Sequence, residues 1–225
     1  MTPMTEEQHA IVSNAVKEAE LMTSGEIVPV ITQSSDGYSD IALAYAIAIA
    51  FTAMSVMVAF PNLYTGLWDA IFTSGWSHEW TIPQFGTLVV GFGLLKFAGS
   101  WLILQWAPLR FFLIPGPVKS ARVRHAAVRH FKVGAERRTH GRTGVLLYLS
   151  MLEHRAEIVA DEPIAEKVRA EVWGEAMADM LAEIRKGCIA EGIAAGVRDV
   201  GKVLSEHFPR TEDDVNELPD RLIEL

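Results

Sequence analysis

The chain has 225 residues, of which 50% are hydrophobic and 21% charged, with a formal net charge of -8 at pH 7. This length accommodates one membrane hairpin and one soluble domain of ordinary size. The single cysteine, Cys188, excludes an internal disulfide. The first 30 residues are acidic and lack an apolar core, so we expect no cleavable secretory signal.

The N-terminal segment predicts a helix followed by a strand. Thr5 and Gln8 have the spacing of a capping box, which indicates that a helix begins there. Its apolar residues recur at helical spacing: Ile11, Val12, Ala15, Val16, Ala19 and Met22. Gly25 is expected to end this helix. The β-branched run Glu26–Thr32 predicts a strand, and Pro29, which cannot donate to a ladder, favours a place at or near a sheet edge.

Two long apolar stretches follow, and they predict a transmembrane hairpin over residues 41–107. Residues 41–60 carry no charge and would form a helix of about 30 Å, the hydrocarbon thickness of a bilayer. Residues 86–107 are as long and carry one charge, Lys96. Small residues at four-residue spacing favour close packing of the pair: Ala42, Ala46 and Ala50, and Gly91, Gly99 and Ser100.

The distribution of basic residues predicts the orientation of this hairpin. Residues 61–85, the expected loop between the spans, contain no Lys or Arg, whereas residues 108–144 are strongly basic. The positive-inside rule then places the basic flank and both termini in the cytoplasm, and the protein in the inner (plasma) membrane as a multi-pass protein. The basic residues expected to meet anionic lipid headgroups are Arg110, Lys119, Arg122, Arg124 and Arg129. Because lipid accounts for this segment, no nucleic-acid partner is expected.

Lys96 would lie near the bilayer midplane, where a charge costs about 3 kcal/mol or more. Two interpretations stay open. In the first, the side chain snorkels or the span is shifted. In the second, an acidic residue of another chain meets the ammonium group in a docked membrane partner.

The remaining chain predicts the second part of a soluble domain. Residues 118–132 read as an amphipathic helix, and Gly144–Ser150 and residues 154–160 as a pair of strands. Helical spacing then continues to residue 207, and residues 208–225 form an acidic tail, either laid on the domain or loose. Since a lone N-terminal strand needs partners, residues 1–40 and 108–207 are predicted to form one discontinuous α+β domain.

Three segments resemble the TPM domain family. They are TSGEIVPVI, RTHGRTGVLLYLSMLEHRAEIVADEPI and GIAAGVRDVGKVL, within residues 5–40 and 118–207. The resemblance implies an αβα sandwich with a small sheet between helices. Members of this family are described as acid phosphatases, as divalent-metal binders, or as accessory proteins that assemble or repair membrane complexes. The chain departs from the family pattern at Ala160, Asp161, Glu162 and Pro163, where many members carry Gly-Tyr-Gly.

The candidate metal ligands are acids that follow predicted strands. Asp36 follows the first strand, and Asp161 and Glu162 follow the third. Their oxygens suit Ca²⁺ or Mg²⁺. The competing interpretation is that these acids serve a turn and a helix cap. The histidines of the basic segment match no zinc pattern and are expected to be solvated: His125, His130 and His140.

Two functions are consistent with these features, and only one of them is enzymatic. The first is a non-catalytic accessory or scaffold protein that acts on other membrane proteins from the cytoplasmic face, either through a membrane protein partner or as a homo-oligomer. The alternative is a membrane-anchored, divalent-metal-dependent acid phosphatase. The absence of a nucleophile motif or redox pair favours the first function.

Overall fold

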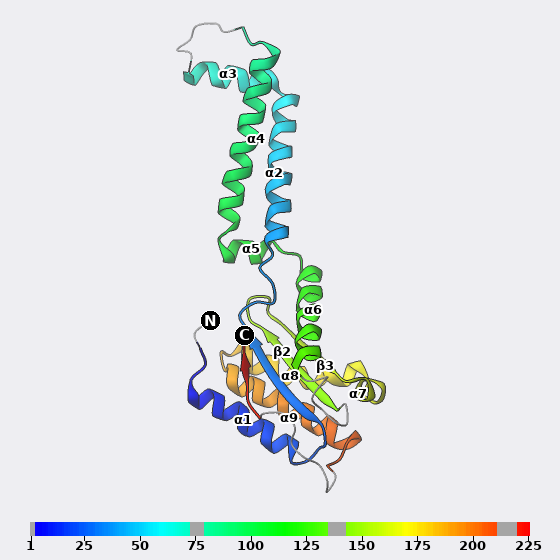
Figure 1. The fold of residues 1–225 in the computed structure, drawn as a ribbon. Helices are drawn as coiled ribbons and strands as arrows, with labels where there is room; N and C mark the ends of the chain where they lie inside the picture. The colour runs from blue at the N-terminus through cyan, green and yellow to red at the C-terminus, as the bar shows by residue number, and fades with distance from the viewer. Residues whose placement is uncertain (1–2, 73–78, 135–142, 211–219) are drawn as a thin grey trace. The chain divides into compact units, whose positions relative to one another are not determined.

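The computed structural model describes residues 3–72, 79–134, 143–210 and 220–225. The chain divides into two compact units (Figure 1). The sheet domain comprises Met1–Asp36 and Pro115–Leu225, and the hairpin unit comprises Gly37–Ile114. The hairpin unit is therefore inserted in the sequence of the sheet domain.

The sheet domain is built from helices around a four-stranded mixed sheet. Its strands are β1 (Glu26–Thr32), β2 (Gly144–Ser150), β3 (Arg155–Ala160) and β4 (Ile223–Glu224). Their order is β3-β2-β1-β4, with β1 parallel to β2 and β4, and β2 antiparallel to β3. Its described helices are α1 (Glu6–Glu20), α6 (Gly116–Gly134), α7 (Glu162–Lys167), α8 (Ala170–Arg185) and α9 (Ile189–His207).

Helices cover both faces of this sheet because its central strands are apolar on both faces. On one face, Ile27, Ile31 and Leu147 belong to the same buried cluster as residues of α1 and α9. On the other face, Leu146 and Tyr148 pack in a cluster with residues of α6. Every residue of β2 is buried, as expected for a strand between two layers. The predicted α+β fold, a mixed sheet flanked by helices, is confirmed.

The C-terminal tail contributes a strand that its sequence did not indicate. Ile223 and Glu224 pair with Val30 and Ile31 of β1, and Leu225 N donates to Ile31 O at 3.0 Å. This pairing begins one residue beyond Pro29, so the missing N–H of the proline lies outside the short ladder. Two residues are too few to show an alternating β pattern. Their pairing depends on β1, which lies about 190 residues earlier in the sequence.

The α1 helix begins as predicted and ends earlier than predicted. Thr5 and Gln8 form the capping box, with Thr5 Oγ1 accepting from Gln8 N at 3.3 Å. The helix ends at Glu20, so Gly25 does not terminate it. A Cβ atom at Gly25 would lie 2.9 Å from Leu204 Cδ1, so this glycine permits the close approach of α9 instead.

The hairpin unit consists of α2 (Ser39–Ala59), α3 (Pro61–Phe72), α4 (Ile82–Leu104) and α5 (Ala107–Leu113). Helices α2 and α4 lie side by side, and both are long and apolar enough to cross a membrane (Figure 1). The three alanines predicted at their interface are buried: Ala42, Ala46 and Ala50. The glycine that faces α2 is Gly93, whose Cβ position is filled by Met54, whereas Gly91 and Gly99 face open space.

Part of the connection between the two long helices is helical, where a loop was predicted for residues 61–85. Helix α3 occupies its first half, and α4 begins at Ile82, four residues before the predicted span. Gln84 Oε1 accepts from Thr81 N at 3.0 Å and fixes that start. The signal for α3 was present in the sequence, because Leu63, Leu67 and Ile71 recur at intervals of four residues.

Candidate functional site

The three predicted metal ligands are each placed by the sheet domain. Asp36 Oδ2 lies 2.7 Å from Arg122 Nη1 of α6, in an ion pair. Asp161 is 2% exposed and occupies the N-cap position of α7, but its Oδ2 accepts from Gly144 N at 2.8 Å rather than from a helical N–H. Glu162 is exposed in the first turn of α7. Asp161 thus joins the end of β3 to the start of β2.

These acids are not brought together. Asp36 follows the carboxyl end of β1, whereas Asp161 binds the first residue of β2, which runs parallel to β1. The two ends of a seven-residue strand are about 20 Å apart. In the ranges that the structure describes, no group of three or more His, Cys, Asp or Glu side chains is positioned to hold a metal ion. The predicted grouping of Asp36 with Asp161 and Glu162 therefore does not form.

The basic residues predicted to meet lipid headgroups come mainly from α6. That helix carries Lys119, Arg122, Arg124 and Arg129. Its apolar residues face the sheet, and Arg124 and Arg129 are exposed, with Arg124 Nη1 3.9 Å from Glu157 Oε2 of β3. Arg110 belongs to the hairpin unit, where its guanidinium lies 5.9 Å from the Phe111 ring centroid. Helix α6 thus carries exposed basic side chains.

A buried polar cluster lies at the carboxyl ends of β1 and β2, and no pattern in the sequence predicts it. Glu153 is 1% exposed and accepts from Ser35 N at 2.8 Å and from the Ser150 hydroxyl. Tyr148 pairs with Ser35 through their hydroxyl groups at 3.2 Å, and its ring stacks on His130. Burial raises the pKa of Tyr148 and lowers that of His130. His130, predicted to be solvated, is half-buried because α6 packs on β2.

A cluster of acidic side chains lies at the opposite end of β1. Glu20, Glu26 and Asp220 line a cavity of about 300 Å³ together with Lys17 and Arg210. Glu20 Oε1 also accepts from Ile27 N at 3.0 Å. Burial, with a smaller contribution from the neighbouring carboxylates of Glu26 and Asp220, raises the pKa of Glu20 to about 9. Glu20 therefore carries a proton at neutral pH, which no local pattern in the sequence predicted.

A groove of about 480 Å³ runs between the β2–β3 turn and α8. Met151, Met177 and Leu181 supply apolar lining, and Arg155 and Arg185 supply positive charge. The groove borders β3, which is an edge strand of the sheet. Methionine side chains adapt to varied apolar partners, and an edge strand offers unpaired backbone groups. This groove can accept an apolar segment that carries acidic residues.

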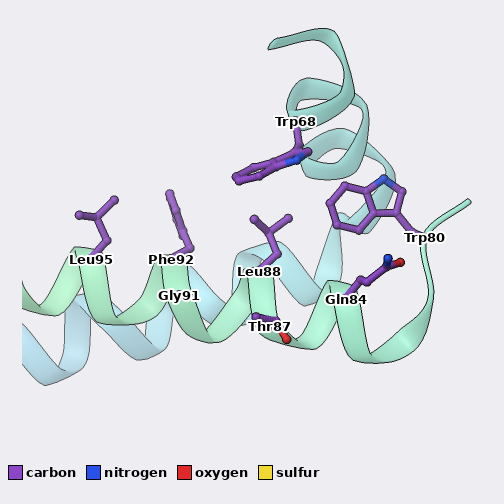
Figure 2. Close-up of a pocket in the computed structure, with 8 residues that line it drawn as sticks. All are labelled: Trp68, Trp80, Gln84, Thr87, Leu88, Gly91, Phe92 and Leu95. Carbon is purple, nitrogen blue, oxygen red and sulfur yellow. The ribbon is translucent and has the colours of Figure 1, made fainter. Parts of the chain in front are cut away.

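The hairpin unit contains a groove of about 560 Å³ between α3 and α4 (Figure 2). Trp68 of α3 faces Leu88, Phe92 and Leu95 on one side of α4. Lys96 is exposed near the middle of α4, and its Nζ lies 5.0 Å from the centroid of the Phe92 ring. The ammonium group thus reaches back along the helix toward its N-terminus, which is the usual direction of a helical side chain.

No protein-family model matches the chain, and no curated protein matches it. Among solved structures, the chain is similar to the BA42 protein from the psychrophilic bacterium Bizionia argentinensis, determined by NMR. The TM-score is 0.55 at 16% sequence identity, over 99% of this chain and 95% of that chain. At this identity the likeness is one of fold, and the chain has a BA42-like α+β architecture.

Proposed function

We propose that the protein crosses the inner membrane twice through its hairpin unit, and that its sheet domain is a TPM-like, non-catalytic accessory or scaffold domain on the cytoplasmic side. The observation that carries the proposal is the insertion of α2 and α4 between two paired strands. Because β1 and β2 belong to one sheet, both ends of the inserted segment must lie on one side of a membrane. An even number of spans meets that requirement.

The surface of the inserted helices supports a lipid environment. Their large apolar side chains are exposed in the described structure, for example Phe51 (63%), Val58 (60%), Leu95 (68%) and Leu102 (69%). An apolar patch of this extent marks an interaction surface. At 21 and 23 residues, α2 and α4 have lengths of about 32 and 35 Å, which suit the hydrocarbon layer.

An accessory role is favoured over phosphatase activity by the sites of the sheet domain. The acids on which a metal-dependent phosphatase would depend lie at opposite ends of the sheet. The groove between α8 and the β2–β3 turn, by contrast, offers an apolar lining, positive charge and an adjacent edge strand. These are features of a peptide-docking surface. We infer that this groove receives an acidic and apolar segment of a membrane protein partner.

The topology is tested with the single cysteine. Cys188 is exposed in the turn between α8 and α9, and a Cys188→Ser, Asn62→Cys variant moves the thiol to α3. We expect a membrane-impermeant maleimide to label Asn62→Cys in intact spheroplasts, and Cys188 only after permeabilisation. Labelling of Cys188 in intact spheroplasts would contradict the cytoplasmic placement. Equal labelling of both positions would contradict the two-span arrangement.

The docking role is tested with a photo-crosslinking amino acid at two adjacent positions of α8. Met177 lines the groove, whereas Ala178 is exposed and does not line it. We expect discrete adducts with a membrane protein from position 177 and not from position 178, in native membranes. An identical adduct pattern from both positions, or none from position 177, would contradict the docking role of this groove.

A further inference from the structure

The groove between α3 and α4 has the dimensions and lining of a binding site for one apolar chain. Figure 2 shows the Trp68 indole extending from α3 above α4, and the side chains of Leu88, Phe92 and Leu95 along the facing side of α4. Its volume of about 560 Å³ falls in the range of small-molecule sites. These α4 residues are spaced by about one helical turn, so they form a continuous strip along the helix.

The aromatic end of this groove is held in place before any ligand binds. Trp80 Nε1 donates to Asp69 Oδ2 at 3.1 Å, which ties the start of α4 to α3. The Trp68 ring meets Trp80 edge to face at 6.4 Å between centroids and lies 4.4 Å from the Phe72 ring. Side chains fixed in this way lose little further freedom when a ligand binds, which favours affinity.

The lining of the groove leaves room at one residue of α4. A Cβ atom built at Gly91 would meet no heavy atom within 4 Å, although Gly91 lines the groove. The volume beside it is therefore not filled by another side chain. A larger side chain at position 91 can enter the groove without distorting the helix, which provides a direct way to fill the site.

The charges of this region favour a ligand with a positively charged headgroup. The sequence has no Lys or Arg between Lys17 and Lys96, while Asp69 and Glu79 lie in or beside the segment that carries the two indoles. At the end formed by Trp68, Trp80 and Asp69, an anionic headgroup would meet the negative charge of Asp69, whereas Lys96 lies farther along α4, over the Phe92 ring. An ammonium group gains both the carboxylate of Asp69 and the faces of Trp68 and Trp80, because cations are attracted to aromatic faces.

We propose that the groove between α3 and α4 binds one amine-headed phospholipid. One acyl chain lies along Leu88, Phe92 and Leu95, and the ammonium group lies at the end formed by Trp68, Trp80 and Asp69. The inference rests on the proposed function, because a lipid reaches this groove when α4 spans the bilayer. It adds a specific lipid site to a hairpin that would otherwise serve as an anchor alone.

The test is native mass spectrometry of the full-length protein in detergent, titrated with phosphatidylethanolamine or phosphatidylglycerol. The filling variant is Gly91→Leu, and the matched control is Gly99→Leu, since Gly91 and Gly99 both face open space and only Gly91 of this pair lines the groove. We expect one tightly held phosphatidylethanolamine in the wild type and in Gly99→Leu. In Gly91→Leu its binding should be weaker by at least about tenfold, because displacing two methylene groups has that effect.

A second variant tests whether the ammonium headgroup lies beside Asp69. Asp69→Asn keeps an oxygen that can accept from Trp80 Nε1 but removes the charge, so it should reduce the preference for phosphatidylethanolamine over phosphatidylglycerol by about threefold. Equal retention of lipid by wild type and Gly91→Leu would overturn the inference. Equal binding of the two lipids by the wild type would overturn it as well, since the proposal includes the head.

Flotation with liposomes separates this inference from the proposed function. If the wild type does not float with liposomes, the membrane-spanning proposal fails. If the wild type and Gly91→Leu both float, and neither holds a stoichiometric phosphatidylethanolamine, the anchor stands and only the lipid site is overturned.

Discussion

The two units place their apolar side chains in opposite ways. In the sheet domain, Val12 and Val197 are fully buried, and the carboxyl groups of Glu153 and Asp161 are buried with hydrogen-bond donors beside them. In the hairpin unit, Leu94 and Leu95 are 65% and 68% exposed. Burial of apolar side chains stabilises the sheet domain, whereas the outward apolar side chains of the hairpin unit would gain free energy if an apolar environment covered them. The comparison predicts how each unit responds to substitution.

The largest effect is expected where a side chain is added inside the sheet domain. A Cβ atom at Gly192 of α9 would lie 2.8 Å from Met180 O of α8, so backbone atoms must move to admit it. Gly192→Leu should destabilise the sheet domain by about 3 kcal/mol. Pulse proteolysis of the detergent-solubilised protein in urea measures this change.

The control is the same substitution in the hairpin unit. Gly99 of α4 meets nothing within 4 Å, so Gly99→Leu should leave both the proteolysis midpoint and membrane partitioning unchanged. A Gly99→Leu variant as unstable as Gly192→Leu would show that the outer surface of α4 is packed, contrary to the comparison.

The next effect concerns the buried polar cluster at the ends of β1 and β2. Glu153→Ala leaves Ser35 N without its acceptor and should destabilise the sheet domain by about 2 kcal/mol. Glu162→Ala removes an exposed carboxyl in α7 and should change stability by less than about 0.5 kcal/mol. Equal urea midpoints for the two variants would contradict the structural role assigned to Glu153.

A pH effect follows from Glu20. Its pKa is about 9 in the folded state against an ordinary value of 4.5, so between these values the folded state holds a proton that the unfolded chain has lost. Stability should therefore fall as pH rises across this window, by at most about 1.4 kcal/mol per pH unit. We expect Glu20→Gln, which stays neutral, to abolish the fall between pH 7 and 9. A slope in Glu20→Gln equal to that of the wild type would assign it to other groups.

The parts of the fold that the sequence predicted are those with local causes. The capping box at Thr5 and the bounds of β1 and β2 follow from neighbouring residues, and the structure places them where the pattern indicates. The strand at Ile223–Glu224 and the proximity of Asp220 to Glu20 depend on contacts between the two ends of the chain. No spacing within one segment reports such contacts.

The candidate site illustrates the same division. The sequence predicted that Asp36 and Asp161 follow strands. The end of the sheet that each one occupies depends on strand direction, because β1 runs parallel to β2 and β2 runs antiparallel to β3. Lys96 shows the converse case. Its place near the middle of α4 is evident from the sequence. The contact of its ammonium group with the Phe92 ring is seen only in the structure of the helix.

The smallest effect is expected for the acids proposed as metal ligands. If the sheet domain is a docking domain, the detergent-purified protein should show no chelator-sensitive hydrolysis of an aryl phosphate, and an Asp161→Asn, Glu162→Gln double variant should give the same result as the wild type in this assay. Asp161 accepts from Gly144 N, so its structural role predicts a loss of stability and no loss of turnover. Chelator-sensitive turnover that disappears in the double variant, with the variant still folded, would instead establish a metal-dependent phosphatase. Because Asp36 lies at the other end of the sheet, Asp36→Asn would then leave that turnover intact and confine the metal to the Asp161 end.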